Sequence, residues 1–305
     1  MSDQADGLRQ LVQARSGATA LVDPPEPCRS LEAPVGTRSL VFTSGKGGVG
    51  TSNLALNLAI ALSECGSRVV LVDADLGLAN IDLLCGLAPT SDLGDVLAGE
   101  CSVADTIVTG PGEIKIVPGA HGTRTLVEML GDGPSRIVSE LETLEAEADF
   151  LLVDSGSGLG PGVATLAGAA DQLVVVTTPE PTSLADAHAV IGRFRRLSGP
   201  SRLRTVINQA ASAAEAADVQ SRLDASSRQF LGTVVKGLGY VRSDPHVPLA
   251  VRMRKPFVLA YPSSIASKGV RRLARDLIDE HSPRSPRPGF FASLAARWAL
   301  SRVAR

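Results

Sequence analysis

A glycine-rich loop between two regular segments constrains the fold of this chain more than any other feature. The loop reads Ser-Gly-Lys-Gly-Gly-Val-Gly-Thr-Ser from Ser44 to Ser52, after the apolar run Ser39–Thr43 and at the start of the helical segment Ser52–Glu64. A glycine-rich turn between a strand and a helix directs successive backbone N–H groups at one point, where the helix N-terminus adds positive potential. The loop therefore predicts a phosphate-binding strand–loop–helix unit.

One position of the loop departs from the P-loop pattern. Gly45 and Gly50 have the expected spacing, and Ser52 supplies the hydroxyl expected to meet Mg²⁺. Thr51 stands where the pattern has a lysine, whereas Lys46 is an early lysine within the loop. The candidate phosphate-binding residues are Gly45, Lys46, Gly47, Gly48, Val49, Gly50, Thr51 and Ser52.

The chain beyond the loop alternates between short apolar runs and helical segments. The predicted strands are Ser39–Thr43, Arg68–Val72, Ile114–Val117, Phe150–Val153, Leu173–Thr177, Arg204–Ile207 and Gly232–Val235. The predicted helices are Ser52–Glu64, Leu126–Leu144, Leu159–Gly168, Ser183–Leu197 and Ala211–Phe230. Near-continuous Val/Ile/Leu strands separated by helices predict an α/β fold with a doubly wound, mostly parallel sheet and helices on both faces.

Three aspartates follow buried strands of this predicted sheet. Asp73 and Asp75 come after Arg68–Val72, and Asp154 closes the run Phe150–Val153. Ligands in such folds bind beyond the carboxyl ends of the strands. A carboxylate there is costly unless it is paired or bound to a metal. The pattern favours Asp154 near Mg²⁺ and predicts that Asp73 and Asp75 are paired or metal-bound, although strand-end aspartates also cap helices.

Composition narrows the function classes. A formal net charge of −2 gives no general attraction to nucleic acid or to anionic membranes, and the 3% aromatic content argues against base-stacking platforms. The apolar runs are shorter than the roughly 18 residues of a membrane-spanning helix. The polar start is unlike a secretory signal, and the four cysteines lack metal-binding spacing. These features predict a cytoplasmic protein.

The chain divides into three predicted parts: an N-terminal peptide and Pro-rich tether at 1–36, an α/β domain at 37–280, and a basic amphipathic C-terminal helix at 281–305. The last part has five arginines and no acid. Phe290, Phe291, Leu294 and Trp298 fall within about a quarter of the helical wheel. Such a helix either lies on a membrane surface or docks on its own domain.

Several motifs resemble one protein family. Gly45-Lys46-Gly47-Gly48-Val49-Gly50 is similar to the deviant Walker A loop of the MinD/ParA P-loop ATPases. The segments 72–82 and 177–187, together with Leu238-Gly239-Tyr240-Val241 and 254–258, resemble the flagellar FlhG branch, also called FleN or YlxH. The N-terminal Asp3-Gln4-Ala5 resembles the activator helix of that branch. The resemblance covers nearly the whole chain and is weakest over residues 13–36.

The resemblance implies residue roles. Lys46 would contact phosphate of a partner subunit's nucleotide, Asp75 would position the attacking water, and Asn208 would recognise adenine. Ser52 would bind Mg²⁺, with Asp73 and Asp154 supporting the metal, and Ser155-Gly156-Ser157-Gly158 would be switch II. Thr51 and Arg242 depart from the family, which has a lysine and usually a proline at these positions, whereas Asp244 is retained.

The resemblance also implies ligands and partners. ATP or ADP with Mg²⁺ would be bound, and ATP would drive homodimerisation. An FlhF-type GTPase would engage the Asp3-Gln4-Ala5 helix, with flagellar switch-ring proteins or a flagellar transcription regulator as further partners. Residues 289–305 would attach the protein reversibly to the inner face of the cytoplasmic membrane.

The expected function is a nucleotide-dependent switch for flagellar number or placement, with hydrolysis slowed by Thr51. A pseudo-ATPase scaffold and a ParA-like DNA-partition or cell-division positioning protein are the alternatives.

Overall fold

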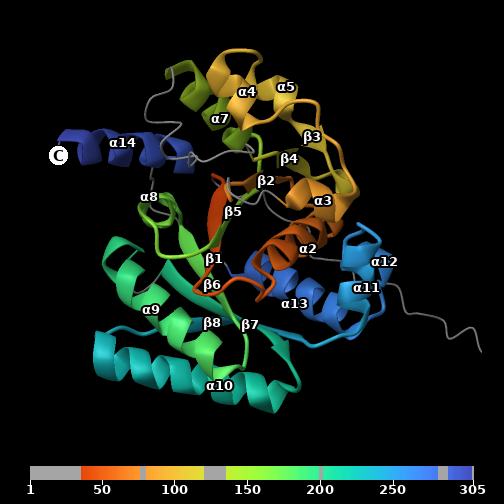
Figure 1. Cartoon of the computed structure of the whole chain (residues 1–305), viewed down its shortest axis with the longest axis vertical. Coiled ribbons are helices and arrows are strands. Elements are labelled where there is room, and N and C mark those ends of the chain that lie inside the picture. Colours follow the sequence, from red (N-terminus) through yellow and green to blue (C-terminus); the bar gives the residue numbers. More distant parts are fainter. Residues whose placement is uncertain (1–35, 76–79, 120–134, 199–201, 281–287, 304–305) are drawn as a thin grey trace, which may run out of the picture. The chain divides into compact units, whose positions relative to one another are not determined.

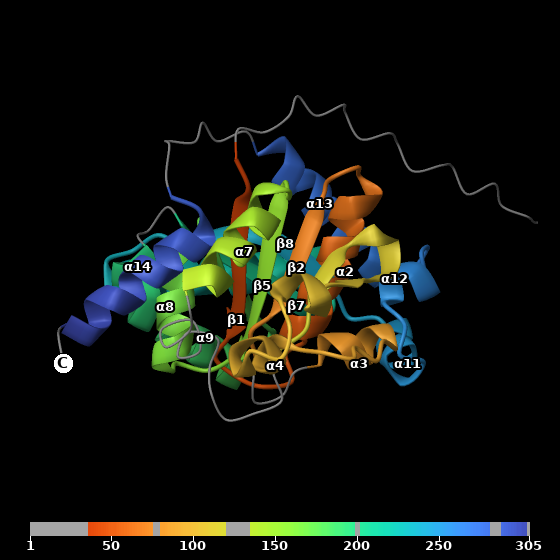
Figure 2. The ribbon, with the colours of Figure 1, turned by 90° about the horizontal axis from the view of Figure 1, so that it is seen from above.

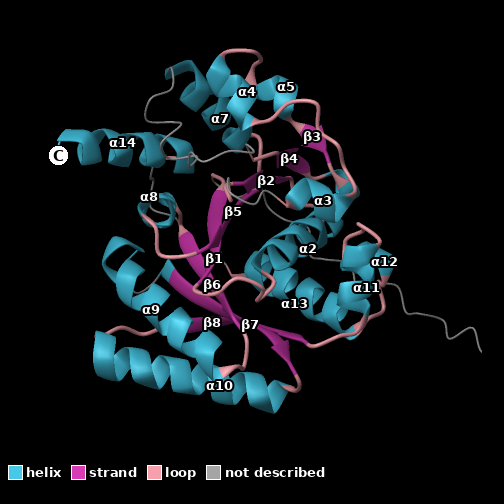
Figure 3. Cartoon of the chain, in the orientation of Figure 1, coloured by secondary structure: helices cyan, strands magenta, loops and turns pink. Residues whose placement is uncertain are grey.

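The computed structural model describes residues 36–75, 80–119, 135–198, 202–280 and 288–303. Its strands form one sheet in the order β3-β4-β2-β5-β1-β6-β7-β8 (Figure 3). Neighbouring strands are parallel except for the antiparallel pair β3 and β4. The strands are β1 (Arg38–Ser44), β2 (Val69–Asp73), β3 (Val108–Thr109), β4 (Lys115–Val117), β5 (Phe150–Ser157), β6 (Gln172–Thr177), β7 (Leu203–Ala210) and β8 (Lys236–Arg242).

Helices connect these strands (Figure 1). The first half of the domain contains α2 (Thr51–Glu64), α3 (Ile81–Cys85), α4 (Leu93–Ala98), α5 (Val103–Thr106), the 3₁₀ turn η1 (Pro111–Glu113) and α7 (Ser135–Ala146). The second half contains α8 (Pro161–Ala169), α9 (Pro181–Ser198), α10 (Ala213–Ser226), the π turn η3 (Ser227–Leu231), α11 (His246–Arg252), α12 (Phe257–Ala260), α13 (Ile265–Asp279) and α14 (Phe290–Val303).

Alternate residues of the central strands belong to two hydrophobic cores, one on each face of the sheet. Val41 and Val153 pack in the core that includes residues of α7, α8, α9 and α14. Leu40 and Leu152 pack in the core that includes residues of α2, α12 and α13. Figure 2 shows α8 and α14 on one side of the central strands and α2 and α12 on the other. The predicted doubly wound, mostly parallel α/β fold is confirmed.

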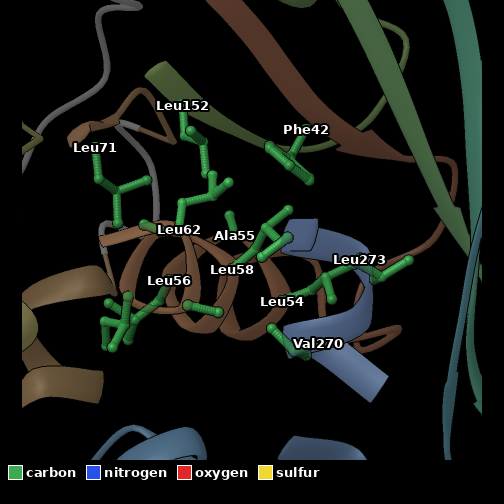
Figure 4. Close-up of a cluster of buried hydrophobic side chains, with 14 of the residues drawn as sticks. Phe42, Leu54, Ala55, Leu56, Leu58, Leu62, Leu71, Leu152, Val270 and Leu273 are labelled. Atoms are coloured by element: carbon green, nitrogen blue, oxygen red, sulfur yellow. The ribbon is translucent and has the colours of Figure 1, made fainter. Parts of the chain in front are cut away.

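Helix α2 is buried nearly all round because its sequence is apolar on most faces. Its leucines face Phe42, Leu71 and Leu152 of the sheet on one side, and Val270 and Leu273 of α13 on another (Figure 4). This packing fixes the helix that begins directly after the glycine-rich loop.

One predicted strand was wrong. Residues 232–235 contain no strand residue, and the last strand is β8. Among the described strands β8 pairs with β7 alone, which makes it an edge strand. Edge strands are protected by charge and tolerate glycine, so the sequence Lys-Gly-Leu-Gly-Tyr-Val-Arg lacked the apolar signature of a central strand.

The other predicted boundaries shift by a few residues. The helix predicted over Leu126–Leu144 is observed from Ser135, and its first part lies outside the described residues. Strand β5 continues past Asp154 to Ser157, and the short strand β3 was not predicted. Within the described parts of the chain, no helix is long and apolar enough to cross a membrane.

Candidate nucleotide-binding site

The glycine-rich loop adopts a conformation that requires glycine at two positions. Gly48 has φ 83° and Gly50 has φ 88°, both in the left-handed region that side chains disfavour. Gly50 is the N-cap residue of α2, so the unpaired N–H groups of the first helical turn lie at the end of the loop. Thr51 is the first residue of the helix and is buried. The loop thus has the backbone of a phosphate cradle with a short neutral side chain where the pattern has lysine.

Helix α9 lies directly against the beginning of the loop. A Cβ atom at Gly45 would lie 2.5 Å from the backbone carbonyl carbon of Asp186. Lys46 reaches the start of the same helix: its Nζ is 2.9 Å from Oε2 of Glu180, the residue before α9, and 3.4 Å from Oγ1 of Thr182 in its first turn. Hydrogen bonding to Glu180, followed by its charge, raises the pKa of Lys46. The early lysine is therefore a cation held within its own chain in this structure.

Asp73 and Asp154 occupy equivalent positions on neighbouring strands. They are register partners at the carboxyl end of the pair β2 and β5, and both are buried. Asp73 accepts backbone hydrogen bonds from Asp75, Asn80 and Ile81 at 3.0 to 3.1 Å. Burial, together with the charge of Asp154, nevertheless raises the pKa of Asp73 to about 7. Two carboxylates so close create a region of negative potential that favours a cation.

Asp154 connects this pair to the glycine-rich loop. It accepts a hydrogen bond from the hydroxyl of Ser52 and another, at 3.1 Å, from the backbone N–H of Gly156. Burial is the main cause that raises the pKa of Asp154 to about 6. Hydroxyl and carboxylate oxygens are ligands that suit Mg²⁺, which binds proteins through one or two such groups together with phosphates and waters. The residues present therefore fit a magnesium ion.

Asp75 lies against the predicted switch II. A Cβ atom at Gly156 would overlap its carboxylate, and Gly156 also has a positive φ of 65°. The switch is joined to the glycine-rich loop through backbone, because Gly158 N–H donates to the Ser44 carbonyl at 2.9 Å. The predicted switch II is therefore in direct contact with the glycine-rich loop through Gly158 and Ser44, and with the Asp75 carboxylate through Gly156.

Asn208, in β7, also contacts the glycine-rich loop. Its Nδ2 donates to the Val49 carbonyl at 2.8 Å and approaches Gly50 closely. The next strand, β8, ends at Arg242, whose Nε donates to the Ala211 carbonyl at 3.1 Å. Asp244 accepts from the backbone N–H groups of His246 and Ala266 at 2.9 and 3.0 Å. Asn208, Arg242 and Asp244 therefore lie at or just beyond the carboxyl ends of β7 and β8.

The C-terminal helix docks on the domain. Phe290, Phe291 and Leu294 of α14 are buried in the core that it shares with α7 and α8. The two carboxylate oxygens of Glu145, in α7, accept from the backbone N–H groups of Phe290 at 2.6 Å and Phe291 at 3.1 Å. Of the two predicted alternatives for this apolar face, docking on the protein's own domain is the one seen in this conformation, and membrane attachment remains a prediction. The side chain of Trp298 lies outside the described residues.

The sequence did not reveal two acidic residues that contact these features: Glu180, which pairs with Lys46, and Glu145, which accepts from the start of α14. Glu180 was part of the segment 177–187, but nothing in the sequence joins it to Lys46. Glu145 was an unremarked acid near the end of a helix. Neither pairing has a local signal, since the partners are separated by 134 and 145 residues. The activator helix predicted at Asp3-Gln4-Ala5 lies outside the described residues.

Comparison with known proteins is consistent with this geometry. Residues 40–256 match the family model described as the CobQ/CobB/MinD/ParA nucleotide binding domain. The chain is 36% identical over 248 residues to the antiactivator FleN of Pseudomonas aeruginosa, covering 81% of this chain and 89% of FleN. It is 29% identical to the flagellum site-determining protein YlxH of Helicobacter pylori, covering 80% and 83% of the two chains. The structure of the septum site-determining protein MinD of Pyrococcus horikoshii, complexed with Mg-ADP, superposes with a TM-score of 0.64 at 26% identity, covering 80% of this chain and 96% of that one.

Proposed function

This chain belongs to the CobQ/CobB/MinD/ParA nucleotide-binding family, and we propose that it acts as an ATP-dependent dimerisation switch that regulates flagellar number or placement. Similarity to FleN and YlxH over about four fifths of the chain supports the flagellar role. The observation that carries the switch is the contact of one carboxylate pair, Asp73 and Asp154, with the loop through Ser52 and with switch II through Gly156.

ATP or ADP would lie on the loop. The backbone of Gly45, Gly47, Gly48, Val49 and Gly50, with the first helical residues Thr51 and Ser52, would hold the phosphates. Ser52, Asp73 and Asp154 would hold Mg²⁺, which neutralises phosphate charge when it is bound. Asn208 would recognise the adenine, since its amide already contacts the loop at Val49.

Asp75 would orient the attacking water. Its position against Gly156 means that rearrangement of switch II changes the place of this carboxylate. A nucleotide that orders switch II would therefore align Asp75, and its loss would release it. Asp75 and Lys46 are the proposed catalytic residues.

Thr51 would make hydrolysis slow. A lysine beside two phosphates makes one or two charge-assisted hydrogen bonds, each worth about 1.5–3 kcal/mol. Backbone N–H groups, Mg²⁺ and Lys46 remain to bind the ground state. The loss is larger where charge moves toward the leaving oxygen, so it falls mainly on turnover.

Lys46 would serve the partner subunit. In one chain it pairs with Glu180, whose side chain is 64% exposed, so the pair is weak and exchangeable. A phosphate of a second subunit's nucleotide carries more charge than one carboxylate and would draw Lys46 away from Glu180. Dimerisation would then depend on ATP.

The experiment measures Mg-ATP affinity by calorimetry and dimer mass by light scattering. Wild type is expected to bind Mg-ATP and dimerise, whereas Lys46→Ala is expected to bind ATP and stay monomeric. Lys115→Ala is the matched control, because Lys115 is also a half-exposed lysine in an ion pair. Failure of wild type to bind Mg-ATP would refute the proposal.

The two ends of the chain would connect the switch to partners. We propose that Asp3-Gln4-Ala5 stimulates an FlhF-type GTPase, which deletion of residues 2–12 tests through the GTPase rate. We also propose that α14 leaves its groove to attach the cytoplasmic protein reversibly to the inner membrane surface. Flagellar switch-ring proteins or a flagellar transcription regulator would be further partners.

A second candidate is a pseudo-ATPase scaffold of the same fold, which the neutral residue Thr51 favours. It would bind partners equally well with and without nucleotide. Hydrolysis of labelled ATP, measured with and without the GTPase partner, separates the two functions. A septum-positioning role is favoured by the similarity to septum site-determining MinD proteins, among them those of Pyrococcus horikoshii and Bacillus subtilis.

A further inference from the structure

A basic hollow lies on the outer side of the sheet's edge strand. It has a volume of about 340 Å³ and lies between β8 and α13. The residues that line it are Tyr240, Arg242, Ile265, Lys268, Gly269, Arg272 and Arg275. Four of these seven residues are cations, although the chain as a whole has a formal net charge of −2.

The charge is concentrated by helical spacing. Lys268, Arg272 and Arg275 lie at intervals of four and three residues, so they share one face of α13 and are exposed. The opposite face of the helix, with Val270 and Leu273, is buried in the core. The hollow is therefore where the polar face of this helix meets the open side of β8.

These cations have no acidic partner in the part of the domain that the structure describes. Among the described residues, no carboxylate lies within the 4.0 Å ion-pair distance of Arg242, Lys268, Arg272 or Arg275. Arg271, between them in sequence, behaves differently: its guanidinium makes hydrogen bonds of 2.7 and 2.9 Å to the two oxygens of Glu64. Structural pairing is thus available on α13 but is not used by the residues that line the hollow.

Two of the guanidinium groups are held in place. The Arg272 guanidinium stacks over the Tyr240 ring, 5.0 Å from its centroid. Arg242 is anchored through Nε to the Ala211 carbonyl, which leaves its other N–H groups for a ligand. Side chains fixed before binding lose less conformational entropy when a ligand arrives. Both groups are planar forks that match phosphate oxygens.

We propose that this hollow binds a small anion with two or more phosphate groups. Two phosphate groups carry a charge of about −3 to −4 at pH 7, which matches four unpaired cations. A single carboxylate would balance only one of them. The hollow is concave and local, unlike the extended basic stripe that follows a nucleic-acid backbone.

This site is separate from the nucleotide site. β8 is three strands away from β1, which leads into the glycine-rich loop, and this separation is roughly 14 Å across the sheet. The proposal therefore goes beyond the proposed function and does not depend on it.

Tyrosine gives a direct readout, because the chain has only two, Tyr240 and Tyr261. Tyr240 lines the hollow, whereas Tyr261 packs on His246 with ring centroids 4.6 Å apart. The full chain is labelled with 3-fluorotyrosine, and the two fluorine resonances are assigned with Tyr261→Phe. Inorganic tripolyphosphate is then titrated in the absence of Mg²⁺. Because Tyr240 lies three strands from the glycine-rich loop, we expect no Tyr240 shift from binding there, and failure of the proposed function is recognised separately by calorimetry with Mg-ATP.

The expected result is a saturable shift of the Tyr240 resonance with wild type. The variant Arg272→Glu/Arg275→Glu is expected to bind at least about tenfold more weakly, since two charge-assisted contacts are reversed in sign. The matched control is Arg193→Glu/Arg196→Glu, which reverses two exposed arginines at the same spacing on α9 and is expected to bind like wild type. Arg275→Gln provides a milder change should the double variant unfold.

Three results would overturn the proposal. The first is no saturable shift of Tyr240 with tripolyphosphate. The second is equal affinity of wild type and both Arg275 variants. The third is a Tyr240 shift with a 20-nucleotide single-stranded DNA, polyglutamate or phosphatidylglycerol vesicles but not with tripolyphosphate, which would assign the surface to a macromolecule or membrane.

Discussion

At the scale of single residues, Thr51 is the position where the side chain departs most from the surrounding structure: the loop has the backbone of a phosphate-binding loop, but the Thr51 side chain has no charge to contact a phosphate. It begins α2 and is buried beside a loop whose backbone is otherwise that of a phosphate cradle. The sequence predicted this loop because glycine spacing, strand and helix are all local signals. It could not indicate that Lys46 is held by Glu180, since that contact joins distant parts of the chain.

Replacing Thr51 by lysine should restore turnover. The new ammonium would add one or two charge-assisted contacts to phosphate, a gain of about tenfold to several hundredfold in kcat/KM. Steady-state hydrolysis of Mg-ATP measures it. Thr51→Met is the control, because methionine has a similar length and no charge. Equal rates for the two variants would mean that the missing lysine does not limit hydrolysis.

Asp244 should contribute to the pH dependence of the free energy of unfolding in acid. Burial opposes its ionisation, but hydrogen bonds from Ala266, His246 and Ser264 outweigh burial and lower the pKa of Asp244 to about 2. The folded state then binds fewer protons than the unfolded state between pH 2 and the ordinary value of 3.8. Its contribution, about 2 kcal/mol, is complete above pH 3.8 and is lost as the pH falls through 2.

Urea unfolding from pH 3 to pH 7 tests this contribution. Asp244→Asn should lower the free energy of unfolding at pH 7 by about 2 kcal/mol and flatten its dependence on pH at the acid end. Asp218→Asn is the control, because Asp218 belongs to an exposed ion pair at 3.6 Å on α10. If both variants retain the acid slope of wild type, Asp244 does not carry it.

At the scale of elements, local sequence predicted the central strands and failed at the periphery. β1, β5 and β6 are apolar runs buried on both faces, so their composition identified them. β8 was misplaced because an edge strand needs no such composition. For α14, periodicity predicted the amphipathic helix but left two alternatives for its apolar face, since a membrane and a protein groove both accept phenylalanine and leucine. The contacts with α7 and α8 distinguish them in this conformation.

Glu145 should hold α14 in its groove. Its carboxylate accepts from the first two N–H groups of the helix, and removing it leaves two buried donors unpaired at about 1–3 kcal/mol each. Glu145→Ala should therefore accelerate hydrogen exchange in residues 290–303. Glu142→Ala, one turn earlier in α7, serves as the control. Unchanged exchange in Glu145→Ala would show that apolar packing alone holds the helix.

At the scale of the whole molecule, the nucleotide site and the C-terminal helix are connected by a short path. The proposed switch II begins in the last residues of β5, α8 follows it closely, and α14 packs on α8 with the Arg297 guanidinium against Gly168. The proposed reordering of switch II by ATP would displace α8 and weaken this contact. Two short helices in a dimer would then bind a membrane more tightly than one, because the second binds at high effective concentration.

Membrane attachment should consequently require both ATP and dimerisation. With anionic vesicles and Mg-ATP, the fluorescence of Trp298, the only tryptophan in the chain, should change, and the protein should float with the vesicles. Lys46→Ala should fail in both assays although its α14 is intact. Without ATP, Glu145→Ala should bind vesicles more than wild type does but less than wild type with Mg-ATP, because its helix is released but each monomer has only one. If wild type binds vesicles equally well with ATP, with ADP and without nucleotide, α14 is not coupled to the nucleotide site.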